Sequence, residues 1–171
     1  MKIAIVGYSG AGKSTLAKQL SEYFKIPCYH LDKIQFSKDW ELRDRKEADE
    51  LVHDLMIQDE WIIDGNYNEF DFEHRMADAN IIIFLNYPRR ICLYRALKRN
   101  IQYHNRVRDS IAEGCNEKFD FEFFWWIMVE GRSSEFKNRL KNLNEKYPKK
   151  YHEIKNNKQL TKFIKQLESK A

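Results

Sequence analysis

The sequence predicts an α/β protein of three layers, in which a five-stranded parallel sheet is covered by helices on both faces. Short apolar runs of strand type alternate along the chain with amphipathic stretches of helical periodicity, and this alternation indicates parallel strand pairing. A glycine-rich turn joins the first strand to the first helix. Because 171 residues is the size of one domain, we expect residues 1–171 to form a single domain.

Five short runs have the composition of strands, and the run at residues 80–85 is the most convincing buried strand. The expected strands are residues 2–6, 28–31, 61–63, 80–85 and 151–154. The expected helices are residues 13–24, 43–58, roughly 120–146, a helix opened by Pro88, and a last helix that contains Leu160, Phe163, Ile164 and Leu167. In the helix after Pro88, the apolar face consists of Leu93, Ala96, Leu97 and Ile101.

Composition and cysteine usage favour a globular protein of the cytoplasm. Hydrophobic residues make up 43% of the chain and charged residues 33%, and no apolar run is long enough to cross a membrane. The first strand begins at once, which leaves no room for a signal peptide. Cys28, Cys92 and Cys115 are widely spaced and include no C-x-x-C pair, as expected of reduced thiols. The net charge of +4 suits phosphate ligands and does not require nucleic acid.

Residues 7–14 form the most informative motif. They read Gly-Tyr-Ser-Gly-Ala-Gly-Lys-Ser and fit the pattern G-x-x-x-x-G-K-[ST] between a strand and a helix N-terminus. Gly7 and Gly12 let the backbone approach an oxyanion, so that successive N–H groups point at phosphates. Lys13 supplies a mobile charge for the β- and γ-phosphates, and the Ser14 hydroxyl suits Mg²⁺. The residues expected to hold ATP are Gly7, Ser9, Gly10, Ala11, Gly12, Lys13, Ser14 and Thr15. A glycine-rich turn without a ligand is the alternative.

Two carboxylates are expected at the same edge of the sheet as this loop. The second strand ends at Asp32 and the third at Asp64, and ligands of parallel sheets bind at the carboxyl ends of the strands. We expect Asp64 to hold Mg²⁺ together with Ser14, the alternative being a turn-forming Asp-Gly pair. Asp32 is expected to accept a proton from an acceptor hydroxyl, to orient that hydroxyl, or to help hold the metal. Its alternative is a helix cap or a turn.

Phosphoryl transfer also needs positive charge around the migrating group and exclusion of water. The planar fork of arginine suits phosphoryl oxygens, and four of the arginines that follow the fourth strand are well placed in the sequence to supply this charge. They are Arg95, Arg99, Arg106 and Arg108. Residues 100–118 are polar and weakly periodic and contain Gly114, so we expect a lid there. The side chains predicted to act in catalysis are Lys13, Asp32, Arg99, Arg106 and Arg108.

Residues 119–126 contain an unusually dense run of aromatic side chains. One interpretation is a platform that stacks a nucleotide base. The favoured interpretation is a helix packed into the core, because aromatic residues mostly supply buried area. The five histidines have no metal-ligand spacing, so no zinc site is predicted.

The phosphate loop and the segments that follow resemble the DNA topology modulation protein family, small P-loop proteins similar to adenylate kinase and other nucleoside and nucleotide kinases. The matching segments are residues 7–15, 30–32 with Trp40, 61–67 and 106–117. The resemblance implies a P-loop NTPase fold of the nucleotide-kinase type. It also implies base contacts from the region of residues 154–156.

Two departures from the family pattern bear on the acceptor. The family reads Arg-Pro-Asp after its lid arginine, whereas Arg108 is followed by Asp109 and a serine. Adenylate kinases also have an arginine shortly after their Asp-Gly pair, and none stands there in this chain. A monophosphate acceptor would therefore have to be held by Arg43, Arg45 or Arg75.

The function predicted from these features is a kinase that transfers the γ-phosphoryl group of ATP to a nucleoside, a nucleotide or another small acceptor, as a monomer or homodimer without a membrane partner. The alternative is a nucleotide-dependent regulator of DNA topology with little turnover of small molecules. Against it, the sequence contains no helix-turn-helix signal, no RNA-binding signature and no long basic stripe. A GTPase switch is a weaker alternative, because the chain has no Asn-Lys-x-Asp or Asp-x-x-Gly motif.

Overall fold

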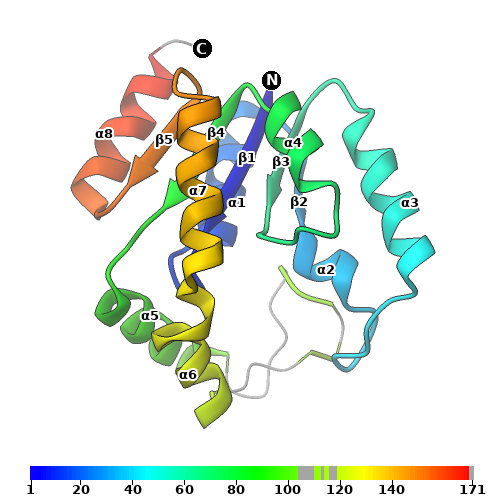
Figure 1. Ribbon diagram of the computed structural model, residues 1–171, viewed down its shortest axis with the longest axis vertical. Coiled ribbons are helices and arrows are strands. Elements are labelled where there is room, and N and C mark those ends of the chain that lie inside the picture. The colour runs from blue at the N-terminus through cyan, green and yellow to red at the C-terminus, as the bar shows by residue number, and fades with distance from the viewer. Residues whose placement is uncertain (104–109, 113, 116–118, 170–171) are drawn as a thin grey trace.

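The computed structural model of the chain describes residues 1–103, 110–112, 114–115 and 119–169. Within them, the strands are β1 (Lys2–Gly7), β2 (Cys28–His30), β3 (Trp61–Asp64), β4 (Ile81–Leu85) and β5 (Tyr151–Ile154). They form one parallel sheet in the order β2-β3-β1-β4-β5, which confirms the predicted sheet (Figure 1).

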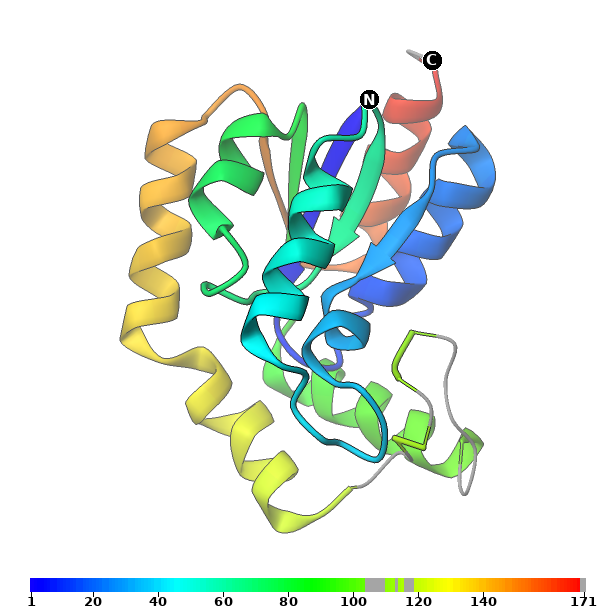
Figure 2. The ribbon, with the colours of Figure 1, turned by 90° about the vertical axis from the view of Figure 1, so that its right-hand side faces the viewer.

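Helices cover both faces of this sheet. They are α1 (Lys13–Phe24), α2 (Leu31–Gln35), α3 (Arg45–Met56), α4 (Phe72–Asp78), α5 (Arg89–Gln102), α6 (Phe121–Met128), α7 (Ser134–Lys146) and α8 (Asn157–Glu168). Figure 2 shows α1 and α8 on one face and α3, α4 and α7 on the other, with α5 and α6 beyond the carboxyl ends of the strands. The predicted three-layer architecture is therefore confirmed. None of the described helices is long and apolar enough to span a membrane.

The central strand β1 explains why the strands read as nearly continuous apolar runs. Residues 3–6 have no measurable exposure, because helices cover both faces and other strands cover both edges. Trp61 at the start of β3 is equally buried. Burial of these large side chains fixes the register of the sheet, and the register in turn fixes where each strand ends.

The helix predicted over residues 120–146 is broken in the structure. Helix α6 ends at Met128, a 3₁₀ turn covers Glu130–Arg132, and α7 starts at Ser134. The break has a local cause, because the Ser133 hydroxyl accepts a hydrogen bond from the Phe136 N–H at 3.2 Å and so caps a new helix. Figure 1 shows the result: α7 runs alongside the sheet, while α6 lies below the strand ends.

The buried face of α5 also differs from the prediction. Leu97 and Ile101 are 40% and 76% exposed, whereas Cys92 and Ala96 are buried. The reason is the neighbour of this helix. A Cβ added to Gly10 would lie 2.3 Å from the Cys92 carbonyl oxygen, so α5 approaches the glycine-rich loop directly, through its small residues.

Two short helices were not predicted at all. Leu31 begins α2 instead of ending a strand, and α4 covers residues that have no clear periodicity. Helices of five and seven residues are too short to show an amphipathic repeat. Tertiary contacts therefore decide their conformation.

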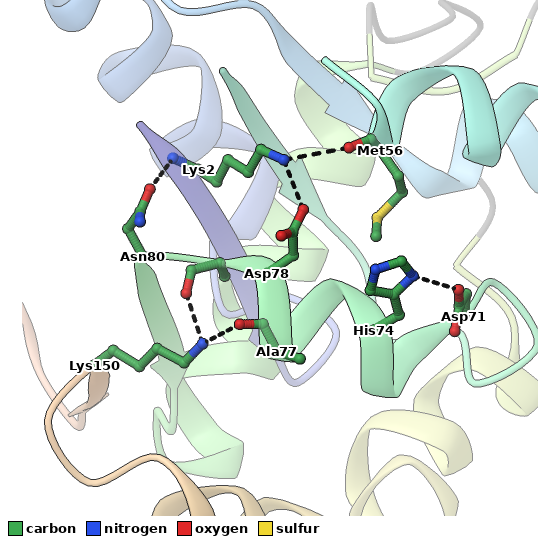
Figure 3. A network of polar contacts seen from close by, with 9 residues as sticks. Lys2, Met56, Asp71, His74, Ala77, Asp78, Asn80 and Lys150 are labelled. Atoms are coloured by element: carbon green, nitrogen blue, oxygen red, sulfur yellow. Dashed lines mark hydrogen bonds and ion pairs between the residues drawn. The ribbon is translucent and has the colours of Figure 1, made fainter. Parts of the chain in front are cut away.

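Polar contacts at the amino ends of the strands hold α4 against the sheet, as Figure 3 shows. The Lys2 ammonium donates to Asp78 Oδ2 at 2.6 Å, and the Lys2 N–H donates to Asn80 Oδ1 at 2.7 Å. The Lys150 ammonium donates to the carbonyl oxygens of Ala77 and Ala79 at 2.6 and 2.7 Å and so satisfies carbonyl groups at the end of α4. This end of the sheet is thus closed by structural contacts, and the opposite end is left for a site.

Candidate phosphate-binding site

The glycine-rich loop lies between the carboxyl end of β1 and the N-terminus of α1, as predicted. Gly10 and Gly12 have φ angles of +77° and +98°, which favour glycine. Gly12 is the residue before the helix and has no side chain to cap it, so the first N–H groups of α1 face the loop interior. The local geometry is that of an anion cradle.

Asn66 clamps the base of this loop. Its Oδ1 accepts a hydrogen bond from the Gly7 N–H at 3.0 Å, and its Nδ2 donates to the Gly7 carbonyl oxygen at 2.7 Å. Both peptide groups at the turn out of β1 are therefore satisfied by one side chain from the segment after β3. The sequence assigned no role to Asn66.

The Lys13 ammonium folds back over the loop. It donates hydrogen bonds to the carbonyl oxygens of Gly7 at 3.0 Å and Tyr8 at 3.4 Å. Burial lowers the pKa of Lys13, and the nearby carboxylates of Asp32 and Asp64 partly counteract this shift. A desolvated cation among backbone acceptors is well prepared to exchange those carbonyl groups for phosphate oxygens.

The two predicted carboxylates lie at this edge and have different surroundings. Asp32, on α2, is half-buried and accepts a hydrogen bond at 2.8 Å from the Tyr67 hydroxyl. Asp64, at the end of β3, is only 4% exposed, and its Oδ1 lies 2.5 Å from Nδ1 of the buried His30. Burial and the Asp32 carboxylate raise the pKa of Tyr67 above its usual range, so this hydroxyl remains a donor. Asp32 is thus the more accessible carboxylate.

The predicted arginines differ in their positions and contacts. Arg95 donates to the Ala11 carbonyl oxygen and to Asn157 Oδ1, both at 2.7 Å, so it braces the loop from α5. The Arg99 guanidinium lies 5.9 Å from the centre of the Phe123 ring. Arg106 and Arg108 lie outside the described residues.

One large cavity opens at this edge of the sheet, with a volume of about 1570 Å³. The residues of its wall that matter most here are residues 9–15, Asp32, Tyr67, Arg99, Trp126 and Arg139. Gly7 lies buried behind the loop. The structure therefore brings the predicted loop residues together with Asp32 and Arg99 around one space.

The aromatic run is not a core helix, contrary to the favoured interpretation. None of its residues in α6 is buried, and Phe121, Trp125 and Trp126 are 74%, 45% and 46% exposed. The one buried residue of α6, Ile127, follows the run. Phe123 and Trp126 of α6 line the cavity, and the Trp126 indole donates to the Ser9 hydroxyl at 3.1 Å. Part of the run is thus a wall of the site. The other interpretation, that the run stacks on a nucleotide base, stays a prediction.

The described part of the predicted lid packs against the segment after α2. Ile111, Ala112 and Cys115 form a small buried cluster with Phe36. Gly114 has a φ of +76°, and a Cβ there would lie 2.0 Å from Asp39 Oδ1. The Trp40 N–H points at Cys115 Sγ at 3.1 Å. These contacts place one part of the segment next to the cavity.

The donor set at the loop fits Mg²⁺. This cation keeps several waters and takes one or two protein oxygens together with substrate phosphates. Ser14 lines the cavity, and the carboxylates of Asp32 and Asp64 both act on the Lys13 ammonium, so they lie near the phosphate end. No group of three or more His, Cys, Asp or Glu side chains with metal-binding geometry occurs within the part of the chain that the structure describes. Any Mg²⁺ held here would be shared with a nucleotide.

Comparison with known proteins agrees with this geometry. The family model of the AAA domain matches residues 3–161. The chain belongs to the AAA domain family. No curated protein matches this AAA domain significantly. The match to the AAA domain family does not confirm the resemblance to the DNA topology modulation family, which stays a prediction.

Solved structures resemble this AAA domain over its whole length. An uncharacterized protein from Eubacterium ventriosum ATCC 27560 has a TM-score of 0.53 at 17% identity, covering 100% of this chain and 99% of that chain. Deoxyadenosine kinase from M. mycoides with bound dATP has a TM-score of 0.51 at 15% identity, covering 98% and 99%. Shikimate kinase from Aquifex aeolicus vf5 has a TM-score of 0.47 at 20% identity, covering 99% and 98%. At these identities the likeness shows the fold alone, a P-loop kinase-like α/β fold.

Sequence reasoning missed several residues of the site. His30, Asn66, Tyr67 and Trp126 each contact a predicted residue directly. His30 and Asn66 stand within two residues of a predicted aspartate at a strand end, and both belong to segments that carry the family resemblance. Trp126 belongs to the aromatic run, but the sequence does not show that this residue contacts the loop.

Proposed function

We propose that this AAA domain is a Mg²⁺-dependent phosphotransferase that moves the γ-phosphoryl group of ATP to a small acceptor. The observation that carries the proposal is that the phosphate loop and Asp32 line one cavity. A volume of about 1570 Å³ exceeds the upper range of single small-molecule sites, so a nucleotide and an acceptor both fit. A protein that only binds a nucleotide needs no additional space for an acceptor molecule.

The loop and Lys13 are the groups that would bind the triphosphate. Backbone N–H groups of residues 10–14 and the ammonium would neutralise the β- and γ-phosphates, with Ser14 and Asp64 as the protein's contribution to Mg²⁺ binding. Mg²⁺ supplies charge neutralisation at the phosphate oxygens when bound. Asn66 and Arg95 hold the cradle in shape from two sides, so that little reorganisation is needed when the nucleotide enters.

Asp32 is the group proposed to face the acceptor hydroxyl. In the transfer, the acceptor oxygen bonds to the γ-phosphorus while the bond from phosphorus to the bridging oxygen of ATP breaks, and ADP leaves. The hydroxyl proton passes to Asp32, whose carboxylate is oriented by the Tyr67 hydroxyl. Such transfer depends mainly on alignment and charge, and a positioned carboxylate supplies the alignment.

Residues 100–118 are proposed to act as the lid. Arg99 already lines the cavity, and closure of this segment would bring Arg106 and Arg108 to the transferring group. The packing of Ile111 and Cys115 next to the cavity supports this placement.

The experiment that tests the proposal separates nucleotide binding from transfer. We expect Lys13→Ala to weaken ATP binding and to lower acceptor-dependent ADP formation by about a hundredfold or more. Asp32→Asn should lower transfer by about the same factor and change ATP affinity by less than about threefold. Asp59→Asn, an exposed aspartate away from the cavity, is the matched control. ATP turnover that Lys13→Ala leaves unchanged with every acceptor would refute the proposal.

A further inference from the structure

Arg139 on α7 is a cation on the wall of the cavity, where its contacts are two aromatic rings. Its guanidinium lies 4.7 Å from the ring centre of Phe72 and 5.0 Å from that of Phe136. Its buried Nε has no hydrogen-bond partner among the described residues. Arg139 itself belongs to the cavity wall. Buried guanidinium nitrogens are normally satisfied, so this atom requires an explanation.

Arg75, on α4, also carries one buried nitrogen without a hydrogen-bond partner among the described residues. The Arg75 guanidinium lies 5.5 Å from the Phe72 ring, so two cations approach one aromatic ring. Arg75 is fully buried, and its Nη1 also has no partner within the described residues. Burial and the nearby Arg139 together lower the pKa of Arg75 to about 10, against the opposing effect of the Asp71 and Glu69 carboxylates. Two desolvated like charges are unfavourable unless an anion lies between or beside them.

The neighbouring carboxylates do not serve as that anion. Glu69, Glu73 and Glu135 act on Arg139 electrostatically, but none forms an ion pair with it in the part of the chain that the structure describes. All three are exposed, and Glu73 is paired with Lys146 at 3.0 Å. Arg139 therefore lines the cavity together with Glu69 and Glu135, without an ion pair to either among the described residues.

The arginine pair is connected to the proposed transfer site. Arg75 Nη2 donates to the Tyr67 carbonyl oxygen at 2.7 Å, and the Tyr67 hydroxyl donates to Asp32 at 2.8 Å. Arg75 Nε donates to the Phe70 carbonyl oxygen at 2.7 Å, which fixes the segment after Tyr67. One ordered segment therefore links the carboxylate that faces the acceptor hydroxyl to the cations beside Phe72.

We propose that Arg139, supported by Arg75, binds an anionic group of the phosphoryl acceptor, a carboxylate or a phosphate. The acceptor would then be a small alcohol that carries an acidic group, with its hydroxyl at Asp32 and its anion at Arg139. The planar guanidinium of arginine binds both groups bidentately, and the rings of Phe72 and Phe136 hold it in place. The inference rests on the proposed function, because it names the acceptor's chemical class.

This assignment replaces the arginines expected from the sequence as anchors for an acceptor phosphate. Arg43 donates to the Ile34 carbonyl oxygen and pairs with Glu47, and Arg45 pairs with Asp49. Neither lines the cavity. Arg75 is too deeply buried to be the first contact, so its part is to support Arg139.

Direct anion binding is the first test, and it does not depend on transfer. The phosphate loop is saturated with a non-hydrolysable ATP analogue and Mg²⁺, and inorganic phosphate or acetate is titrated while the melting temperature is followed. We expect at least one anion to raise the melting temperature of the wild type and of Lys137→Met, an exposed control on the same helix. Arg139→Met should weaken that binding by about tenfold or more. The proposal is overturned if neither anion binds, or if Arg139→Met binds as tightly as the wild type.

Turnover with matched acceptors is the second test. Pairs of small alcohols with and without a carboxylate, and with and without a phosphate, separate the two anion sources. We expect Arg139→Met to raise KM for the preferred anionic member by about tenfold or more and to leave KM for ATP unchanged. Arg139→Lys should restore part of the loss, because it keeps the charge without the fork. Equal use of neutral and anionic acceptors by the wild type would overturn the inference alone, whereas failure of all acceptors would refute the proposed function.

Discussion

His30 Nδ1 lies 2.5 Å from Asp64 Oδ1, and both side chains are buried, with exposures of 7% and 4%. Because an ionised carboxylate only accepts hydrogen bonds, Nδ1 carries the proton and donates it. The contact fixes the orientation of the Asp64 carboxylate at the end of β3. Within the described residues, Oδ2 of Asp64 has no hydrogen-bond partner. A water molecule bound to Mg²⁺ would find an acceptor there.

We predict that His30→Gln raises the Mg²⁺ concentration for half-maximal ATP turnover by about tenfold, because metal-site carboxylates lose affinity when their supporting hydrogen bond is removed. The free energy of unfolding should fall by about 1 to 3 kcal/mol, since a buried carboxylate loses its partner. Mg²⁺ titrations at saturating ATP and urea unfolding measure the two effects. His53→Gln on the exposed side of α3 is the control, and a His30→Gln enzyme with unaltered Mg²⁺ dependence would contradict the assignment.

Asn66 is predicted to be needed for nucleotide affinity without touching the nucleotide. Asn66→Ala removes both hydrogen bonds to Gly7, so the turn out of β1 loses its anchor. Calorimetry should show ATP binding weakened by about fivefold to twentyfold, and stability should fall by about 1 to 2 kcal/mol. The control change Asn138→Ala, at an exposed position of α7 outside the cavity wall, should do neither. Equal affinities of the two variants would show that the loop holds its shape without the clamp.

Proton uptake on ATP binding follows from the environment of Lys13. Burial lowers the pKa of Lys13 in the free protein, and phosphate oxygens would raise it in the complex. Between these two pKa values the free protein holds the neutral amine and the complex holds the ammonium, so binding must take up a proton. KM for ATP should accordingly rise as pH increases through the pKa of the free protein. Calorimetry in buffers of different ionisation enthalpy measures the uptake, and Lys13→Met should abolish it. Proton release on binding would contradict the sign.

Gly10→Ala is predicted to destabilise the fold by at least about 2 kcal/mol. The φ of +77° is strained for alanine, and its Cβ would lie 2.3 Å from the Cys92 carbonyl oxygen, a backbone atom that cannot rotate away. Helix α5 would have to move from the loop, so ATP binding should be lost as well. Urea unfolding checks the stability, and a loss below about 0.5 kcal/mol would show that α5 does not pack against Gly10 as described.

The sheet could be predicted because burial on both faces leaves a clear record in the sequence. An apolar run such as Ile81–Leu85 is identified as a buried parallel strand because helical stretches precede and follow it. The break between α6 and α7 was missed because a single serine cap decides it, and polar residues within a periodic stretch look the same in either case. The prediction for α5 was wrong at Leu97 and Ile101, which are exposed. Helical periodicity indicates an apolar face, but it does not indicate which other element packs against that face.

For the site, the sequence located the groups that a motif or a strand end defines. Lys13, Asp32 and Asp64 lie at one edge because parallel strands end there. The predicted roles of these residues remain proposals. Arg139 could not be predicted, because its position beside Phe72 depends on how α7 lies against α4, and no local pattern encodes that contact.

The most direct test of the account is ATP consumption with Mg²⁺ against pooled nucleosides, nucleoside monophosphates, small sugars and alcohols, and DNA, with Lys13→Ala as the control. We predict that one small-molecule pool, with members that carry a carboxylate or a phosphate, stimulates ADP formation in the wild type and not in Lys13→Ala, with a phosphorylated product. Stimulation by DNA alone, or tight ATP binding without turnover in any pool, would contradict it and favour a nucleotide-dependent regulator.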